Sequence, residues 1–246
     1  EAIVKIVGND WADLQGVGFK TDTGWVERPG TNSVRDYDAL PFPAYELLPE
    51  KQIKKLDIFQ INTTRGCPYV CTFCVRTMWG RVYRKMSPEN LAKQVRFIKD
   101  KFGFERFYFG DDTFGIDRKH LEGICDAVKP LEIRWETEMR AEGVSEEALL
   151  KMRDAGCYKI GIGLETANSE IMTLIDKHLS LEAVKKAVAA AKKVDGISFG
   201  LFVVFGLPGE TEETGRETVE FIKSLDLKTP FGIGLETPYP GTPDFE

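Results

Sequence analysis

The chain has 246 residues, of which 42% are apolar, and a formal net charge of −6 at pH 7. This length and apolar content predict one α/β barrel domain that follows a lead-in segment. The negative charge argues against binding of nucleic acid through bulk electrostatics, and the sequence shows neither a long apolar run nor a leader peptide. We therefore expect neither nucleic acid nor a membrane among its partners.

Residues 1–54 are expected to form an irregular lead-in. Two short strands at 14–19 and 25–27 predict a hairpin, and the prolines of Leu40-Pro41-Phe42-Pro43 predict a stiffened linker after it. Since the chain does not begin with methionine, we expect this lead-in to join residues 55–246 to an upstream domain that is absent from the sequence.

From residue 57 onward, short apolar strands alternate with helices, a pattern typical of βαβ units and a parallel sheet. In the first helix, Leu91, Val95 and Ile98 form one apolar stripe after the cap-like Ser87-Pro88. The pattern predicts six strands, at 58–63, 105–110, 132–138, 159–165, 199–205 and 231–236.

The residues of these strands alternate in character, because successive side chains of a strand point to opposite faces. In the fourth strand, apolar residues at 160, 162 and 164 alternate with Gly161, Gly163 and Glu165. If helices cover the apolar face, glycines and carboxylates line the interior, where a packed barrel has branched apolar residues. A sheet with one face in water gives the same alternation, but right-handed crossovers favour closure toward a barrel whose lumen holds a ligand.

Three of the five cysteines, Cys67, Cys71 and Cys74, stand in a C-x3-C-x2-C pattern on a loop that leaves the first strand. This grouping fits thiolate ligation in a reducing cytoplasm better than a disulfide framework. Iron-sulfur clusters usually take four thiolates, so three suggest a four-iron cluster with one iron open to a small molecule. A zinc site of three cysteines and a histidine is the alternative, but neither His120 nor His178 stands at a zinc-finger offset.

The loop Arg65-Gly66-Cys67-Pro68-Tyr69-Val70-Cys71-Thr72-Phe73-Cys74 resembles the signature of the radical S-adenosylmethionine (SAM) superfamily, in which an aromatic residue, here Phe73, precedes the last cysteine. The resemblance covers residues 55–243. It implies a (β/α)6 partial TIM barrel, open laterally, with a [4Fe-4S] cluster at its C-terminal mouth. In that family an electron from the cluster, delivered by a reductant such as flavodoxin or ferredoxin, cleaves SAM to a 5'-deoxyadenosyl radical that abstracts hydrogen from a substrate.

The resemblance also implies cofactor contacts beyond Phe73. Asp112 would accept a hydrogen bond from the SAM amino group, and Glu138 and Glu165 would contact its methionine or ribose portions. Lys177 corresponds to a basic residue that neutralises the SAM carboxylate, and Arg140 would serve that carboxylate or the substrate.

Residues 202–210 resemble the fifth-strand segment whose backbone flanks the adenine in this family, so Val204 and Gly206 are expected beside the cofactor. Phe202 stands where some subfamilies have an aspartate that contacts the ribose.

Residues 36–48 and 238–243 resemble segments of cobalamin-dependent members of the family, which methylate unactivated carbons or close rings oxidatively. The chain itself lacks the D-x-H-x-x-G cobalamin motif, because Asp117 and His120 are one residue too far apart. Cobalamin would therefore be supplied by the absent upstream domain.

Two other functions stay open on the sequence alone. A methylthiotransferase-like radical SAM enzyme that acts on RNA or protein shares much of this pattern, but would need a C-terminal RNA-binding module and an N-terminal domain with further cysteines. An iron-sulfur electron carrier or a structural metal module, which performs no catalysis, has little use for a large polar lumen.

Overall fold

The structure is a computed structural model that describes residues 16–28, 34, 36–75, 79–227 and 232–246. The chain divides into two compact units, Glu1–Tyr37 and Asp38–Glu246. In the first unit, β1 (Val17–Thr21) and β2 (Gly24–Arg28) form the predicted hairpin, with antiparallel pairing. Residue 14, where the first strand was expected to start, lies outside the described residues.

The second unit starts with residues from the C-terminal part of the lead-in, and these pack on the barrel. They include the 3-10 helix η1 (Tyr45–Leu47) and the short helix α2 (Glu50–Ile53). Tyr45 packs edge-on against Phe59, with ring centroids 5.0 Å apart, and its hydroxyl accepts a hydrogen bond of 2.9 Å from Gln94. These contacts bury an aromatic ring and attach this part of the lead-in to the first strand of the barrel.

The core of the second unit is a six-stranded parallel sheet in the order β10-β9-β8-β7-β6-β3. Each strand pairs with its neighbour along the chain, and β3 and β10 are the edges of the described sheet, which confirms a partial α/β barrel that is open laterally. A separate antiparallel pair joins β4 (Thr64–Arg65) to β5 (Arg84–Lys85). The six barrel strands are β3 (Phe59–Ile61), β6 (Arg106–Phe114), β7 (Arg134–Met139), β8 (Cys157–Glu165), β9 (Ser198–Phe205) and β10 (Gly232–Leu235).

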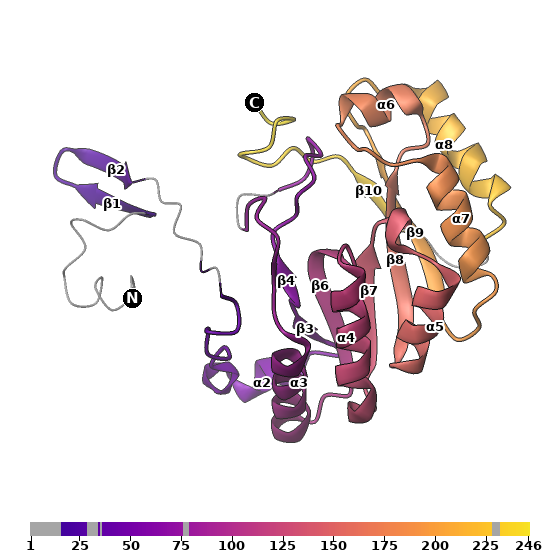
Figure 1. The fold of residues 1–246 in the computed structure, drawn as a ribbon. Helices are drawn as coiled ribbons and strands as arrows, with labels where there is room; N and C mark the ends of the chain where they lie inside the picture. Colours follow the sequence, from indigo (N-terminus) through magenta and orange to yellow (C-terminus); the bar gives the residue numbers. More distant parts are fainter. Residues whose placement is uncertain (1–15, 29–33, 35, 76–78, 228–231) are drawn as a thin grey trace. The chain divides into compact units, whose positions relative to one another are not determined.

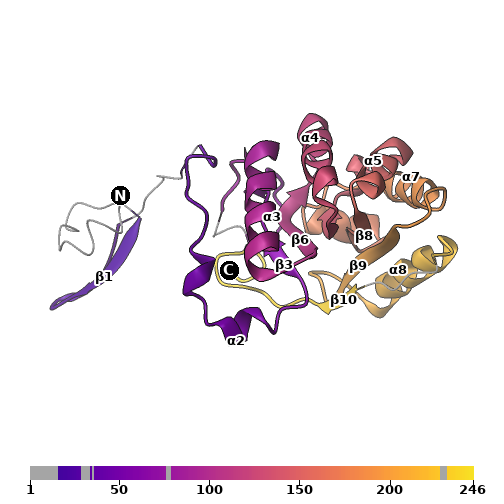
Figure 2. The ribbon, with the colours of Figure 1, turned by 90° about the horizontal axis from the view of Figure 1, so that it is seen from below.

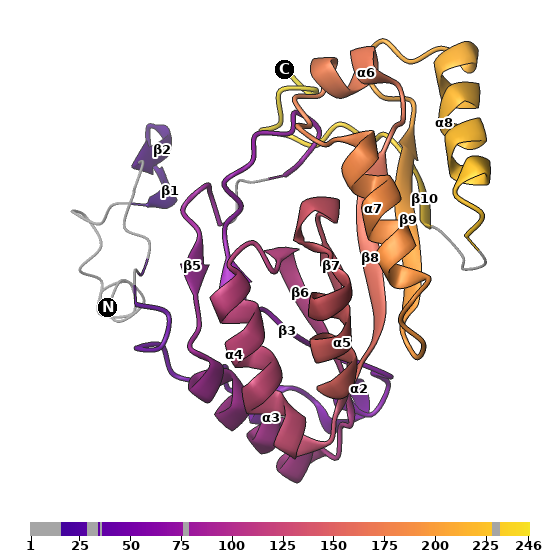
Figure 3. The ribbon, with the colours of Figure 1, turned by 45° about the vertical axis from the view of Figure 1, so that its right-hand side comes forward.

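Most of the helices lie along the convex side of the sheet, and α6 lies beyond the ends of the strands, as Figures 1, 2 and 3 show from three directions. None of the described helices is long and apolar enough to cross a membrane. The helices are α3 (Pro88–Phe102), α4 (Arg118–Val128), α5 (Glu146–Asp154), α6 (Ser169–Leu174), α7 (Leu181–Ala191) and α8 (Glu212–Ser224), with the 3-10 helices η2 (Lys129–Leu131) and η3 (Ala141–Gly143).

Helix α3 begins and ends where its sequence predicts. The Ser87 side chain accepts a hydrogen bond of 3.2 Å from the Asn90 N–H, and Gly103 ends the helix with a φ of +75°. The predicted stripe of Leu91, Val95 and Ile98 is fully buried against the sheet.

The apolar face of the sheet forms the core under the helices. Phe109 packs against Trp135 with ring centroids 4.8 Å apart, and the Trp135 indole donates a hydrogen bond of 2.8 Å to the Ala155 carbonyl. Full burial of one such side chain stabilises the fold by about 1.5–3 kcal/mol. On β10 the expectation of a covered apolar face is wrong, because Ile233 and Leu235 are 66% and 79% exposed. This strand is an edge, and no helix follows it in the described residues.

Strand β6 continues four residues past its predicted end at Gly110, through Asp111 to Phe114. Aspartates at a strand end usually form turns. Here the buried Asp111 carboxylate accepts hydrogen bonds from the N–H groups of Thr63 (2.6 Å) and Thr64 (2.9 Å) and from the Thr63 hydroxyl (2.6 Å). The segment that leads into the cysteine loop is thus attached to β6.

Replacing Asp111 by alanine is expected to destabilise the barrel by about 2–4 kcal/mol, because two buried N–H groups lose their acceptor. Asp111→Asn retains an acceptor oxygen and is expected to stay within about 1 kcal/mol of wild type. Urea unfolding followed by circular dichroism measures both differences. An equal loss in the two variants would show that these hydrogen bonds do not hold the segment.

The Asp111 carboxylate is also expected to make the stability of the fold depend on pH. Burial raises the pKa of Asp111 to about 6, above its ordinary value of 3.8. The folded chain therefore binds this proton more tightly than the unfolded chain. The unfolding free energy of wild type is expected to rise relative to that of Asp111→Asn as the pH is lowered from about 7 to about 5. Urea unfolding of both proteins at several pH values measures this, and a constant difference would contradict it.

Candidate functional site

The cysteine loop follows β4 and is fixed by backbone contacts. Gly66 has a φ of +86°, and a Cβ there would lie 2.3 Å from the Val82 carbonyl oxygen, so only glycine fits. The Gly66 N–H donates a hydrogen bond of 3.1 Å to Asp112, and the Thr72 N–H donates one of 3.0 Å to the Ile175 carbonyl. These bonds attach the loop to β6 on one side and to the end of α6 on the other.

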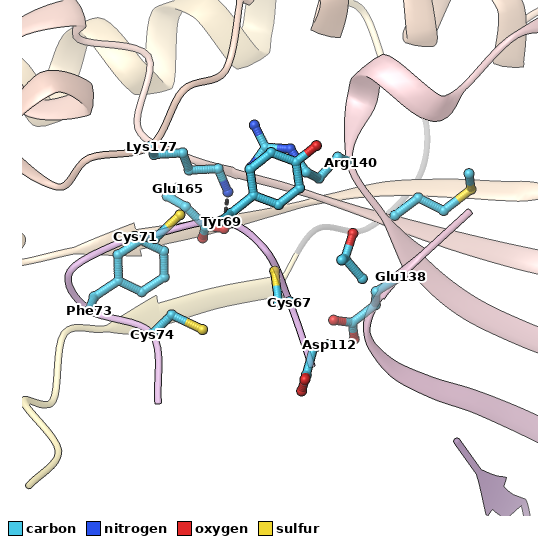
Figure 4. A pocket seen from close by; sticks show the side chains of 13 residues that line it. Cys67, Tyr69, Cys71, Phe73, Cys74, Asp112, Glu138, Arg140, Glu165 and Lys177 are labelled. Atoms are coloured by element: carbon cyan, nitrogen blue, oxygen red, sulfur yellow. Dashed lines mark hydrogen bonds and ion pairs between the residues drawn. The ribbon is translucent and has the colours of Figure 1, made fainter. Parts of the chain in front are cut away.

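The three cysteines of the loop line one cavity of about 140 Å³ (Figure 4). Cys67 and Cys71 are buried, Cys74 is partly exposed, and all three are free thiols. Burial raises the pKa of the Cys67 thiol, so its thiolate form needs a nearby positive charge such as a bound metal supplies. The donor set fits the predicted iron-sulfur cluster.

A zinc site, the alternative to the cluster, would use the same three thiols as ligands. In the described part of the chain, no three cysteine, histidine or carboxylate side chains converge on a single-ion position. In a four-iron cluster each thiolate binds a different iron, which spreads the ligands more widely than one zinc ion does. His120 is engaged elsewhere, because its Nε2 lies 2.7 Å from the Met86 carbonyl oxygen. Metal analysis of the purified protein decides between the two.

Three predicted acidic residues also line the cavity, from the ends of consecutive strands. Asp112 lies on β6, Glu138 on β7 and Glu165 on β8. The carboxyl ends of parallel strands meet at one edge of a sheet, and ligands of open α/β sheets bind there. Asp112 and Glu138 keep part of their surface in solvent, and partial desolvation in the cavity raises the pKa of both carboxyl groups, so both carboxylates would gain from a donor supplied by a ligand.

Lys177 forms a buried ion pair with Glu165, with Nζ and Oε1 2.5 Å apart (Figure 4). Their side chains are only 6% and 11% exposed. A Cβ at Gly163 would lie 2.5 Å from the same Oε1 and 3.0 Å from Nζ, so in this arrangement the ion pair occupies the space that a side chain at position 163 would take. The Lys177 ammonium also lies 6.0 Å from the centre of the Phe73 ring, next to the last cysteine.

Arg140 lies 3.9 Å from the centre of the Tyr69 ring, inside the cysteine loop. Its terminal nitrogen donates to the carbonyl of His178 and lies 3.3 Å from a Glu142 oxygen. Its Nε–H is buried and has no hydrogen-bond partner among the described residues. Both side chains line the cavity, so Arg140 holds the loop through a cation–π contact and still has a donor for an anionic ligand.

Val204 and Gly206 are not among the residues that line this cavity. Val204 packs with Phe73 against the buried apolar cluster of Ile171, Ile175 and Leu207, beside the site. Gly206 has a φ of +84°, and its N–H donates to the Glu210 carboxylate.

Gly163 lines the cavity, as the alternation of the fourth strand predicts, and three further lining residues were not predicted: Tyr69, Thr113 and Met139. All three were recognisable as neighbours of predicted site residues, because Thr113 follows Asp112, Met139 lies between Glu138 and Arg140, and Tyr69 lies between two of the cysteines. The Thr113 hydroxyl is buried without a hydrogen-bond partner in the described part of the chain, so it too is available to a ligand.

The family model of the radical SAM superfamily matches residues 61–222. The uncharacterized methyltransferase PH0819 of Pyrococcus horikoshii is 30% identical over 240 residues, which cover 96% of this chain and 52% of that protein. The anaerobic magnesium-protoporphyrin IX monomethyl ester cyclase of Cereibacter sphaeroides is 28% identical over 192 residues, covering 75% and 31%. The chain thus spans about half the length of these relatives or less.

Among solved structures, the radical SAM methyltransferase TsrM from Kitasatospora setae, with tryptophan substrate and a SAM analog bound, matches with a TM-score of 0.82 and 19% identity. The match covers 98% of this chain and 50% of TsrM. TsrM with cobalamin and a [4Fe-4S] cluster bound matches with a TM-score of 0.77. At this identity the likeness establishes the fold, and it agrees with the predicted partial barrel.

Lys177→Met is expected to lower the unfolding free energy by about 3–5 kcal/mol, because Glu165 would remain as a buried, unpaired carboxylate. The double variant Lys177→Met/Glu165→Gln removes both charges and is expected to recover most of this loss. Urea unfolding measures the differences. Lys223→Met, which breaks an ion pair whose side chains are 66% and 70% exposed, is the control and is expected to cost about 1 kcal/mol or less. A double variant as unstable as Lys177→Met would show that the charges are not the cause.

Proposed function

Because the chain belongs to the radical SAM superfamily, we propose that its barrel is the catalytic domain of a radical SAM enzyme. Cys67, Cys71 and Cys74 would hold a [4Fe-4S] cluster and leave one iron for SAM. The observation that carries this proposal is that the three thiols share one cavity with Lys177 and Arg140. When bound, the cluster and SAM supply one-electron cleavage of the sulfonium bond and a 5'-deoxyadenosyl radical that abstracts hydrogen from the substrate.

Charged side chains of the cavity would bind and orient SAM. The free Nε–H of Arg140 and the ammonium of Lys177 are suited to its carboxylate. Asp112 would accept from its amino group, and Glu138 and Glu165 from its hydroxyl groups. Lys177 is neutralised by Glu165 in the absence of ligand, so a bound carboxylate would compete with Glu165 for the same ammonium.

An apolar wall would flank the adenine. Phe73 and Val204 pack on one apolar cluster beside the cavity, and a flat ring gains most from such a surface. Gly206 has a left-handed backbone conformation and no side chain, so the main chain at this position could approach the adenine closely. The supporting observation is the shared cluster of Phe73 and Val204, which places the aromatic residue of the cysteine motif next to β9.

We infer that the substrate radical ends in methylation of a carbon or in oxidative cyclisation. PH0819 and TsrM are named as methyltransferases and a further relative as a cyclase, which supports both outcomes. Cobalamin, where it is used, would come from a domain that the lead-in of residues 1–54 joins to the barrel. TsrM with cobalamin bound supports this, as does the engagement of His120 with Met86. A D-x-H-x-x-G motif upstream of the barrel in the full-length gene would decide the point.

A radical SAM enzyme needs a substrate and a source of single electrons. A flavodoxin or a ferredoxin is the reductant that we propose here. The five cysteines are all free, which supports a reducing compartment, and we propose the cytoplasm.

Anaerobic reconstitution with iron and sulfide tests the proposed function. With dithionite and SAM, the protein is expected to release 5'-deoxyadenosine, measured by chromatography, and to show an electron paramagnetic resonance signal that changes when SAM is added. Cys74→Ala is expected to lose both, because one of three ligands is missing. Cys125→Ala is the matched control, since Cys125 is buried on α4 away from the cavity, and is expected to keep its iron.

Other outcomes assign other functions. Uptake of zinc without iron would indicate a structural metal site. A cluster that accepts electrons but yields no 5'-deoxyadenosine would indicate an electron carrier. Transfer of a methylthio group to RNA or protein would indicate a methylthiotransferase.

A further inference from the structure

The inner face of the barrel carries two aromatic side chains, Tyr108 and Phe202, that the proposed cofactor site does not account for. In the register of the sheet, Glu138 on β7 pairs with Gly161 on β8, and Gly161 pairs with Gly200 on β9. Gly232 on β10 pairs with Phe202 on β9. These glycines leave the backbone bare on the inner face, so a neighbouring side chain or a ligand approaches it closely.

The aromatic rings of Phe202 and Tyr108 lie next to glycines of the inner face. A Cβ at Gly161 would lie 2.2 Å from the Phe202 ring, and one at Gly232 would lie 2.4 Å from it, so this ring extends over the strands on both sides of its own. On β6 a Cβ at Gly110 would lie 2.6 Å from the Gln60 amide and 2.9 Å from the Tyr108 ring. The Phe202 ring therefore lies across its neighbouring strands, the Tyr108 ring lies next to Gly110, and both residues are partly exposed.

Glu138 stands between these rings, because Tyr108 belongs to the strand on one side and the Phe202 ring covers Gly161 on the other. The Tyr108 hydroxyl donates a hydrogen bond of 3.0 Å to Oε1 of Glu138. The second oxygen, Oε2, has no partner within the described ranges and remains an acceptor. Because the Tyr108 hydroxyl fixes the carboxylate, an incoming donor meets it in one orientation.

We propose that Tyr108, Glu138 and Phe202 form the substrate-recognition surface, and that it takes a planar nitrogen heteroaromatic ring. The ring stacks on the exposed face of Phe202, and its N–H donates to Oε2 of Glu138. This inference rests on the proposed function and names the substrate class for it. Glu138 also lines the cysteine cavity, so a ring bound here lies beside the reacting centre, as hydrogen abstraction requires.

The chemistry of the surface selects against other substrates. An aliphatic substrate gains less from an aromatic face than a flat ring does, even where it carries a donor for the carboxylate. A ring without an N–H fills the same space but leaves Oε2 unpaired. Binding should therefore depend on both the ring and its N–H group.

Indole and 1-methylindole are the probes for this proposal, with cyclohexylmethanol as the non-aromatic comparison. Binding is measured by ligand-observed nuclear magnetic resonance on the whole chain without SAM or reductant. Indole is expected to bind saturably, and the other two several-fold more weakly. Phe202→Leu is expected to weaken indole binding about 3–10-fold, the usual contribution of an aromatic pair. Glu138→Gln is expected to narrow the preference for indole over 1-methylindole.

Phe221→Leu is the matched control, because Phe221 lies on α8, where Lys185 covers its ring at 5.9 Å, and is expected to leave indole binding unchanged. Equal affinities for indole and cyclohexylmethanol would overturn the proposal. Unchanged indole binding in Phe202→Leu, with a lowered melting temperature, would assign that ring to covering the glycines and would also overturn it. The protein could bind indole more tightly than the other two probes and yet form no 5'-deoxyadenosine. That result would refute the proposed function but would support the substrate-recognition surface.

Discussion

The buried carboxylate of Asp111 is the contact on which the geometry of the site depends. It accepts hydrogen bonds from the N–H groups of Thr63 and Thr64, and so attaches the segment before the cysteine loop to the second strand of the barrel. The loop itself has little regular structure. Without a fixed start, its thiols would have no defined position relative to the strand ends, and Gly66 would not reach the neighbouring Asp112. A loop that places ligands must be supported by rigid elements.

The cavity combines opposite charges at a point where the strands end. Lys177 and Arg140 supply positive charge, and Glu165 neutralises the first of them within the barrel. A buried ammonium without a partner would be costly, so this ion pair keeps the cation in place when no ligand is present. Arg140 is held differently, by the Tyr69 ring and a carbonyl group, and keeps one donor free among the described contacts. The two cations therefore meet an anionic ligand in different ways.

Glycine has two distinct uses on the inner face. At Gly163 it leaves room for the ion pair of Lys177 and Glu165. At Gly161 it leaves room for the ring of Phe202, which turns a strand position into a flat apolar surface. In both cases the missing side chain lets a group from elsewhere lie against the backbone, and this is why the interior differs from that of a barrel filled with branched residues.

The sequence by itself determined the features that depend on local spacing. The six strands, the stripe of α3 and the cysteine pattern were predictable, because strand and helix periods and ligand spacing are properties of short segments. The tertiary structure alone decided where β6 ends, which side chain neutralises Lys177 and which ring lies under Arg140. Each of these is a contact between residues of different elements. Its partner is chosen by the curvature and register of the assembled sheet, which no local pattern encodes.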